Sequence, residues 1–167
     1  MHQRQAGFTL IEILVVLALM AVMASIAVIS VRNHDTQSLV DDFVTRLADV
    51  TEIAQEETLF RQRSLGLYLY SGGYLFMAKD DQGWYAEVDR MYVSRQIPEW
   101  FDVSLYVDGQ PVVLERELPD EPVPQILFVS DLEPTPFEML VSTEETLQRK
   151  LERTPTGRIL TDVGASQ

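Results

Sequence analysis

Side chains able to do acid–base chemistry are plentiful in this 167-residue chain, and many of them are carboxylates in adjacent pairs. The pairs are Asp41-Asp42, Glu56-Glu57, Asp80-Asp81 and Glu144-Glu145. Neighbouring residues on a helix point in different directions, so the first two pairs are expected on solvated helix faces. Aspartates in a tight turn, as at Asp80-Asp81, are the usual turn residues. A glycosidase needs two carboxylates that face each other across a cleft, and adjacency alone does not provide that.

The other residues that serve as nucleophiles, bases or metal ligands are scarce. The chain has no cysteine, and its histidines are His2 and His34. A Ser-His-Asp triad would have to use His34, which directly follows a long apolar run, and a zinc site lacks ligands. Calcium binding is an open alternative at Asp80-Asp81 and, separately, at the adjacent residues Asp120 and Glu121, because oxygen-rich turns suit that ion. We expect no catalytic residue, no resident metal and no cofactor.

Glu12 is the acidic side chain with the most unusual surroundings. It precedes 19 residues, Ile13 to Val31, that include no charge, proline or glycine. At about 1.5 Å per residue, a helix of this length extended by Phe8 to Ile11 matches the ~30 Å hydrocarbon core of a bilayer. A carboxylate in hydrocarbon either stays protonated or pairs with a cation. We expect a membrane span at residues 8–31 in which Glu12 has a role; a tolerated, protonated side chain near the interface is the alternative.

The residues before the apolar run carry a resemblance. A secretory signal has its small-residue cleavage site after the apolar run, whereas the only candidate here, Ala6-Gly7, lies before it. The stretch Gly7-Phe8-Thr9-Leu10-Ile11-Glu12, with its basic head and apolar tail, resembles the class III signal of type IV pilins and type II secretion pseudopilins. In that family a prepilin peptidase cleaves after the glycine and methylates the new N-terminal residue. The resemblance implies cleavage after Gly7 and methylation of Phe8.

The resemblance also gives Glu12 a partner. Cleavage after Gly7 would create a new amine on Phe8, and Glu12 would become the fifth mature residue. The family is thought to pair this glutamate with the amine of a neighbouring subunit, where attraction at low dielectric sets the axial register of the two helices. Thr9, Leu10 and Ile11 complete the signal motif.

The charge balance disfavours a nucleic-acid partner. The chain has 26 acidic residues against 13 lysines and arginines, a net charge of −13. Binding to phosphates needs a basic patch, which such a surface lacks. A small group of basic residues does occur near the C-terminus: Arg149, Lys150, Arg153 and Arg158. Carboxylates in the same region, Glu144, Glu145, Glu152 and Asp162, oppose their charge. We expect no nucleic-acid partner.

Hydrophobic periodicity predicts one long helix followed by strands. No proline or glycine occurs between Arg32 and Arg63, and apolar residues recur at steps of three and four. This pattern predicts a helix from about Phe8 to Arg63, with a break near residues 33–36 as an alternative. After Ser64 the period changes to two. Strands are expected at residues 65–70, 74–78, 84–88, 103–107, 112–117, 126–129, 137–141, 147–153 and 158–160, the first two as a hairpin. At 147–153 a helical turn is the alternative, because Leu147 and Leu151 have helical spacing.

These elements predict an α+β fold in which the helix packs on an antiparallel β-sheet or sandwich, as in pilins. The expected parts are a cleaved basic leader at 1–7, a transmembrane helix at 8–31, its amphipathic continuation at 32–63, and a β-rich periplasmic domain at 64–167.

A weaker resemblance lies further along the chain. Its residues are Ile126-Leu127-Phe128, Glu133-Pro134-Thr135-Pro136-Phe137-Glu138-Met139, Thr156-Gly157-Arg158-Ile159, and, at the helix end, Ala54, Glu56, Glu57 and Arg61. They are similar to the H-type minor pseudopilins of type II secretion, a group that shares its domain with minor pilins of the FimT and FimU kind.

This second resemblance implies a structural subunit and not an enzyme. It would lie near the tip of the periplasmic pseudopilus, the filament that helps export folded exoproteins across the outer membrane. Its partners would be other minor pseudopilins, the major pseudopilin, the prepilin peptidase and the bacterial inner membrane, which it would cross once. The alternative is a FimT/FimU-like minor pilin of a type IV pilus.

Overall fold

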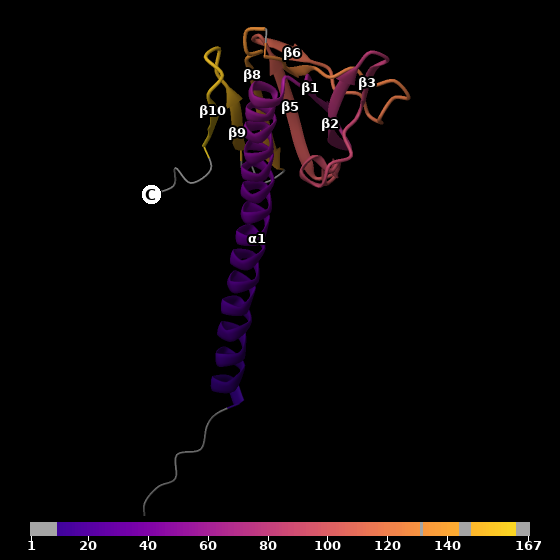
Figure 1. Cartoon of the computed structure of the whole chain (residues 1–167). Helices are drawn as coiled ribbons and strands as arrows, with labels where there is room; N and C mark the ends of the chain where they lie inside the picture. The colour runs from indigo at the N-terminus through magenta and orange to yellow at the C-terminus, as the bar shows by residue number, and fades with distance from the viewer. Residues whose placement is uncertain (1–9, 131, 144–147, 163–167) are drawn as a thin grey trace, which may run out of the picture. The chain divides into compact units, whose positions relative to one another are not determined.

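The computed structural model describes residues 10–130, 132–143 and 148–162, with the side chains of residues 24–35 outside that description. The chain forms two units, residues 1–39 and residues 40–167. In the first unit the described residues are helical. The second unit contains the end of the helix and all the described strands (Figure 1).

Helix α1 runs from Leu10 to Arg61, 52 residues, without the interruption considered near residues 33–36. It ends two residues earlier than expected because Gln62 adopts a left-handed backbone conformation, with φ of 53°. A residue with positive φ directly after the last turn is a common way to end an α-helix.

One face of α1 in the second unit is buried at helical spacing. Its members are Val40, Val44, Leu47, Thr51, Ala54 and Thr58, each at most 2% exposed. Their steps of four and three residues are the predicted amphipathic stripe. The two buried threonines are satisfied, since Thr51 donates to the carbonyl of Leu47 at 2.7 Å and Thr58 to that of Phe128 at 3.2 Å.

Two antiparallel sheets accompany this part of the helix. The first has the order β3-β2-β1-β7, with β4 also paired to β2. Its strands are β1 (Leu65–Tyr70), β2 (Gly73–Asp80), β3 (Gly83–Ala86), β4 (Arg95–Gln96) and β7 (Ile126–Phe128). The second has the order β10-β9-β8-β5-β6. Its strands are β5 (Phe101–Val107), β6 (Gln110–Val112), β8 (Phe137–Thr143), β9 (Gln148–Arg153) and β10 (Ile159–Thr161).

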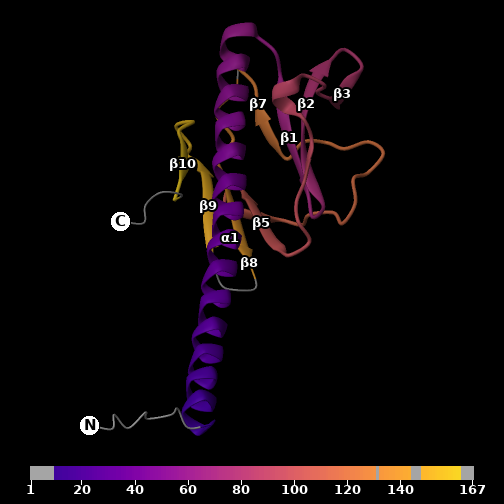
Figure 2. The ribbon, with the colours of Figure 1, turned by 90° about the horizontal axis from the view of Figure 1, so that it is seen from below.

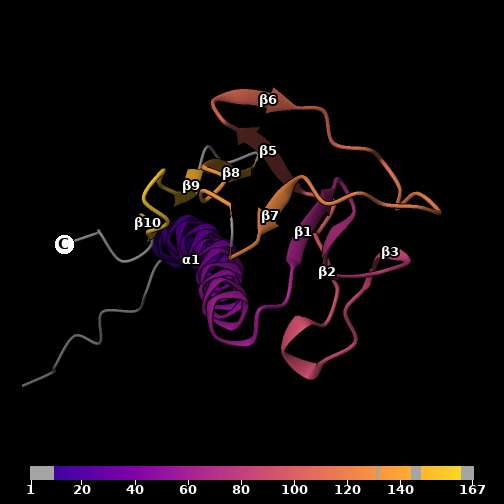
Figure 3. The ribbon, with the colours of Figure 1, turned by 45° about the horizontal axis from the view of Figure 1, so that its top comes forward.

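A single apolar core joins the helix to both sheets. Figures 2 and 3 show the C-terminal part of α1 with β9 and β10 on one side and β7 and β1 on the other. Leu47 from α1, Leu67 and Phe76 from the first sheet, and Leu105 and Met139 from the second all belong to this core. The expected α+β fold, a helix packed on antiparallel sheets, is therefore confirmed.

Several expected strand boundaries were wrong. Residues 113–117 are not in a strand, although 112–117 was predicted as one. Val112 pairs with Leu105, and Leu114 packs against the core from irregular backbone, so alternating hydrophobicity arises there without a strand. Strand β3 ends at Ala86 rather than at Val88, which is 89% exposed.

Two short elements were not predicted. They are β4 and the 3₁₀ helix η1 (Arg90–Tyr92), which starts with the Asp89 carboxylate accepting a hydrogen bond from the Met91 N–H. The strand favoured at 147–153 is confirmed as β9 from Gln148; Leu147 lies outside the described residues.

Candidate functional site

The predicted signal residues lie at the beginning of α1. Gly7, Phe8 and Thr9 fall outside the described residues, whereas Leu10, Ile11 and Glu12 form the first turn of the helix. Leu10 is 81% and Ile11 69% exposed, and Glu12 is exposed as well. A carboxylate in the first turn interacts favourably with the positive end of the helix dipole.

An exposed aliphatic surface follows Glu12 on the same helix. From Ile13 to Met23 every large apolar side chain is at least 45% exposed. The exposed set is Ile13, Leu14, Val15, Val16, Leu17, Leu19, Met20, Val22 and Met23. Contiguous apolar surface of this kind marks a site of contact with protein or lipid.

None of the helices within the described residues combines the length and the hydropathy of a membrane span. The expected span at 8–31 includes residues 8 and 9 and the side chains from 24 onward, which the structure does not describe.

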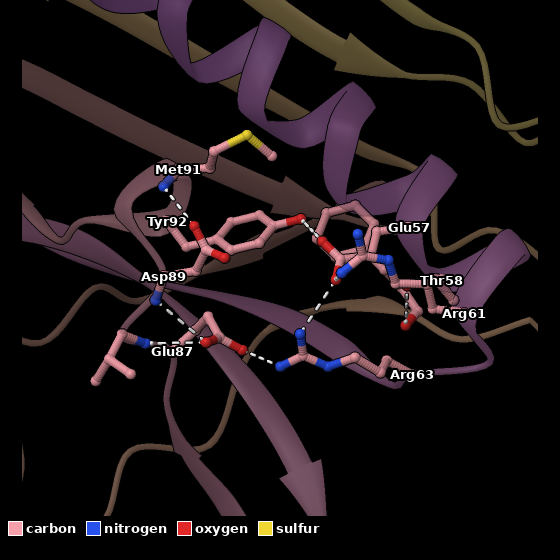
Figure 4. A network of polar contacts seen from close by, with 10 residues as sticks. Glu57, Thr58, Arg61, Arg63, Glu87, Asp89, Met91 and Tyr92 are labelled. Atoms are coloured by element: carbon pink, nitrogen blue, oxygen red, sulfur yellow. Dashed lines mark hydrogen bonds and ion pairs between the residues drawn. The ribbon is translucent and has the colours of Figure 1, made fainter.

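A polar network fixes the other end of α1 to the first sheet (Figure 4). The Tyr92 hydroxyl donates to Oε2 of Glu57 at 2.7 Å. Arg63, just after the helix, donates to Oε1 of Glu57 at 3.1 Å and also pairs with the Glu87 carboxylate at the end of β3. Arg61 adds an ion pair to Glu57 at 3.1 Å. One helical carboxylate thus joins α1, the segment after it and η1.

Glu57 was expected on a solvated face, and this was wrong. Glu56 is exposed as predicted, but the Glu57 side chain is only 10% exposed. Burial raises the pKa of Tyr92 well above its usual range, and the hydrogen bond to the Glu57 carboxylate raises it further. The position of Glu57 on the helix gave no signal for this, because its partners come from residues 63 and 92.

The C-terminal basic residues do not form a patch. Arg149 pairs with Asp41 on α1 at 2.6 Å, and Lys150 pairs with Glu152 at 2.8 Å. Arg153 is 4% exposed, donates to the carbonyl of Leu127 at 2.9 Å, and lies 4.9 Å from the centre of the Phe128 ring. Burial lowers its pKa to about 10.

The carboxylates considered as calcium ligands lie in a turn and in a loop. The Asp80 carboxylate accepts hydrogen bonds from the N–H groups of Gln82 and Gly83, which closes the β2–β3 turn as predicted. Asp120 and Glu121 are exposed in a loop. The adjacent carboxylates Glu144 and Glu145, which were not calcium candidates, lie outside the described residues. In the described part of the chain no three potential ligands lie close enough to hold a metal ion.

Comparison with known proteins begins at the N-terminus. Residues 2–28 match the model of the prokaryotic N-terminal methylation motif, which contains the predicted signal residues. The chain is also 31% identical, over 163 residues, to the type II secretion system protein H of Pseudomonas aeruginosa. That alignment covers 92% of this chain and 87% of the relative. The chain belongs to the type II secretion system protein H family.

Solved structures show that this member of the protein H family has the expected fold. Two structures of the minor pseudopilin EpsH from the type II secretion system of Vibrio cholerae match with TM-scores of 0.60 and 0.61. They are 20% and 17% identical, and the matches cover 74% and 72% of this chain and 96% and 91% of theirs. Membership of the protein H family supports the pseudopilin interpretation over a FimT/FimU-like minor pilin.

Proposed function

We propose that the chain is a minor pseudopilin near the tip of the periplasmic pseudopilus, where it helps drive folded exoproteins across the outer membrane. The identity to protein H along almost the whole chain carries this proposal, because it includes both the methylation motif and the β domain. Its role is to bind other subunits, and we assign it no catalytic residue, metal or cofactor.

The first step is processing by the prepilin peptidase. Cleavage falls between Gly7 and Phe8, and the Phe8 amine is then methylated. The motif match over residues 2–28 supports this assignment. Mass spectrometry of the mature N-terminus tests it: Phe8 is expected as a methylated first residue, and a Gly7→Val chain is expected to keep its leader.

Glu12 then sets the register of the assembled helix. The processed amine of a neighbouring subunit lies at the same depth and pairs with the Glu12 carboxylate, one turn into the exposed apolar surface of α1. Thr9, Leu10 and Ile11 form the rest of the signal. The partners are other minor pseudopilins and the major pseudopilin.

The apolar segment also anchors the chain before assembly. Residues 8–31 cross the inner membrane once, residues 32–63 continue the helix, and residues 64–167 form the periplasmic domain. The leader, residues 1–7, faces the cytoplasmic peptidase. Protease added to spheroplasts is expected to digest the β domain, while digestion only after lysis would reverse this orientation.

A strain lacking this gene distinguishes the proposal from a role in type IV pili. Loss of exoprotein secretion, restored by the wild-type chain, with normal surface piliation is the expected result. Intact secretion with lost piliation would favour the minor pilin instead.

A further inference from the structure

A groove lies beside the helix in the second unit, bounded by cationic side chains. Arg46 from α1, Arg90 from η1 and Arg95 from β4 line it, with Ile53, Met91 and Val93 among its apolar lining residues. These six residues are called the arginine groove. Its volume is about 270 Å³.

The three arginines of the groove form no ion pair in the described part of the chain. Asp and Glu outnumber Lys and Arg by 26 to 13 in the chain, yet none of the described carboxylates forms an ion pair with these three arginines. By contrast, Arg61, Arg63, Arg149 and Lys150 all have carboxylate partners. Asp42 and Asp49 lie one turn to either side of Arg46 on the helix, yet neither is within ion-pair distance of it.

Two of these cations converge on the wall of the groove. The charges of Arg95 and Arg46 both act on the buried Tyr74 hydroxyl, where they oppose the dominant effect of burial on the pKa of Tyr74. Arg46 from α1, Arg95 from β4 and Tyr74 from β2 line the same groove. Three arginines without an ion pair among the described residues therefore line the same groove.

The groove also exposes apolar surface. Met91 is 49% and Val93 51% exposed, and both lie on or directly after η1. A groove lined by both arginines and exposed apolar side chains has the composition of a protein-binding site, in which arginine is enriched and the rim is polar. The charge complementary to it is a segment bearing carboxylates and aliphatic side chains.

We propose that the arginine groove receives the carboxylate-bearing helix of a neighbouring pseudopilin subunit. This inference rests on the proposed function. The chain's own helix shows that the fold can present such a segment: Asp49, Glu52 and Glu56 are exposed on α1 at steps of three and four residues and have no ion-pair partner among the described residues. A groove on one subunit that binds a helix on the next is a heterologous contact, which generates a filament.

Photo-crosslinking in cells tests the contact. A benzoylphenylalanine replaces Val93 in the full chain, expressed in the deletion strain, and the adduct is mapped by mass spectrometry. Val113, 92% exposed and outside the groove, is the control position. The expected result is an adduct from position 93 to the helix of another pseudopilin subunit or a second copy. Two results would overturn the inference. One is the absence of any protein adduct, as expected if lipid or nucleic acid occupied the groove, and the other is an adduct to any other protein.

Charge reversal shows whether the arginines cause the contact. With Arg46→Glu and Arg95→Glu, the adduct is expected to fall about tenfold, equivalent to ~1.4 kcal/mol of binding free energy. Arg116→Glu and Arg158→Glu, matched reversals of exposed arginines outside the groove, are expected to leave it unchanged. An adduct that survives reversal in the groove contradicts the inference. If the double variant does not accumulate, Arg90→Glu alone repeats the test on an exposed side chain.

Failure of the groove and failure of the proposed function give different results. If the wild-type chain restores secretion to the deletion strain but position 93 yields no pseudopilin adduct, only the inference about the groove fails. If the wild-type chain does not restore secretion, the proposed function itself fails.

Discussion

At the scale of single residues, two carboxylates of α1 have separate tasks. Glu12 is exposed in the first turn, where we propose that it pairs with another subunit, whereas Glu57 is nearly buried in the last turns. Glu57 accepts hydrogen bonds from Tyr92, Arg63 and Arg61, so its charge is compensated within the chain. Removing one donor from a nearly buried carboxylate lowers the stability of the fold.

Tyr92→Phe is expected to lower the free energy of unfolding by about 1–2 kcal/mol, because the hydrogen bond to Glu57 is lost at a buried position. Urea unfolding of the full chain in detergent measures this change. Tyr85→Phe is the matched control, since Tyr85 is 43% exposed and is expected to stay within ~0.5 kcal/mol of wild type. Equal effects of the two variants would contradict the role of the Tyr92–Glu57 contact.

Stability is also expected to fall at alkaline pH. The pKa of Tyr92 is raised in the folded state, so the folded chain holds this proton more tightly than the unfolded chain. The resulting stability is fully present below the ordinary tyrosine pKa of about 10 and is lost as pH rises above it toward the folded-state pKa. Urea midpoints measured between pH 8 and pH 11 should decline less in Tyr92→Phe than in wild type. An identical decline in both would exclude Tyr92 as the cause.

At the scale of elements, periodicity identified the helix because it buries one face at its own repeat, and it identified most strands from runs or alternation of apolar residues between turn residues. The stripe of α1 has steps of three and four residues, and β8 alternates buried and half-buried positions along its whole length. Residues 89–100 gave no such signal. Their short elements, η1 and β4, are held by contacts to distant residues, as Tyr92 is by Glu57, and local sequence does not contain that information.

The same limit applied to the candidate site. Glu12 could be found from the sequence because its context, a carboxylate next to an apolar run, is local. The arginine groove could not be found, because Arg46 is far in sequence from Arg90 and Arg95 and lines the same groove only after η1 and β4 have packed beside α1.

The helix stripe should dominate the stability of the second unit. Leu47 is fully buried in the core shared by both sheets. Leu47→Ala is expected to cost about 2–5 kcal/mol of unfolding free energy through lost burial and a cavity. Leu59→Ala, on the same helix but 59% exposed, is the control and should cost far less. Differential scanning calorimetry compares the two; similar melting temperatures would contradict the described helix face.

Glycine at the β1–β2 turn is required by a close backbone approach. A Cβ added at Gly73 would lie 2.4 Å from the carbonyl oxygen of Arg95 in β4, and backbone cannot move aside cheaply. Gly73→Ala is expected to destabilise the chain by about 1–3 kcal/mol. At Gly72 the nearest atom, 3.0 Å away, belongs to the Tyr70 ring, which can shift. Hydrogen exchange should show faster exchange in β4 for Gly73→Ala than for Gly72→Ala, and equal rates would contradict this packing.

At the scale of the whole molecule, one chain combines a folded β domain with an apolar helix segment that is exposed in the isolated subunit. A surface of this kind is stable only when lipid or other subunits cover it. We therefore expect an amphiphilic subunit that leaves the membrane by assembling with its neighbours, and we propose that Glu12 sets the register.

Glu12→Ala is expected to leave cleavage after Gly7 intact and to reduce incorporation into the pseudopilus severely, by about tenfold if the lost pairing is worth ~1.4 kcal/mol. Crosslinking to the other pseudopilins, followed by quantitative blotting, measures incorporation. Glu99→Ala, which removes an exposed carboxylate from the β domain, is the control. Wild-type incorporation of Glu12→Ala would exclude the register role.

The central claim, that the chain serves type II secretion, is tested most directly by the location of folded exoproteins. In a deletion strain, their enzymatic activity is measured separately in the culture supernatant and in the periplasm, with and without the wild-type chain. The account predicts that active exoproteins accumulate in the periplasm of the deletion strain and return to the supernatant on complementation. Unchanged activity in the supernatant of the deletion strain would contradict it.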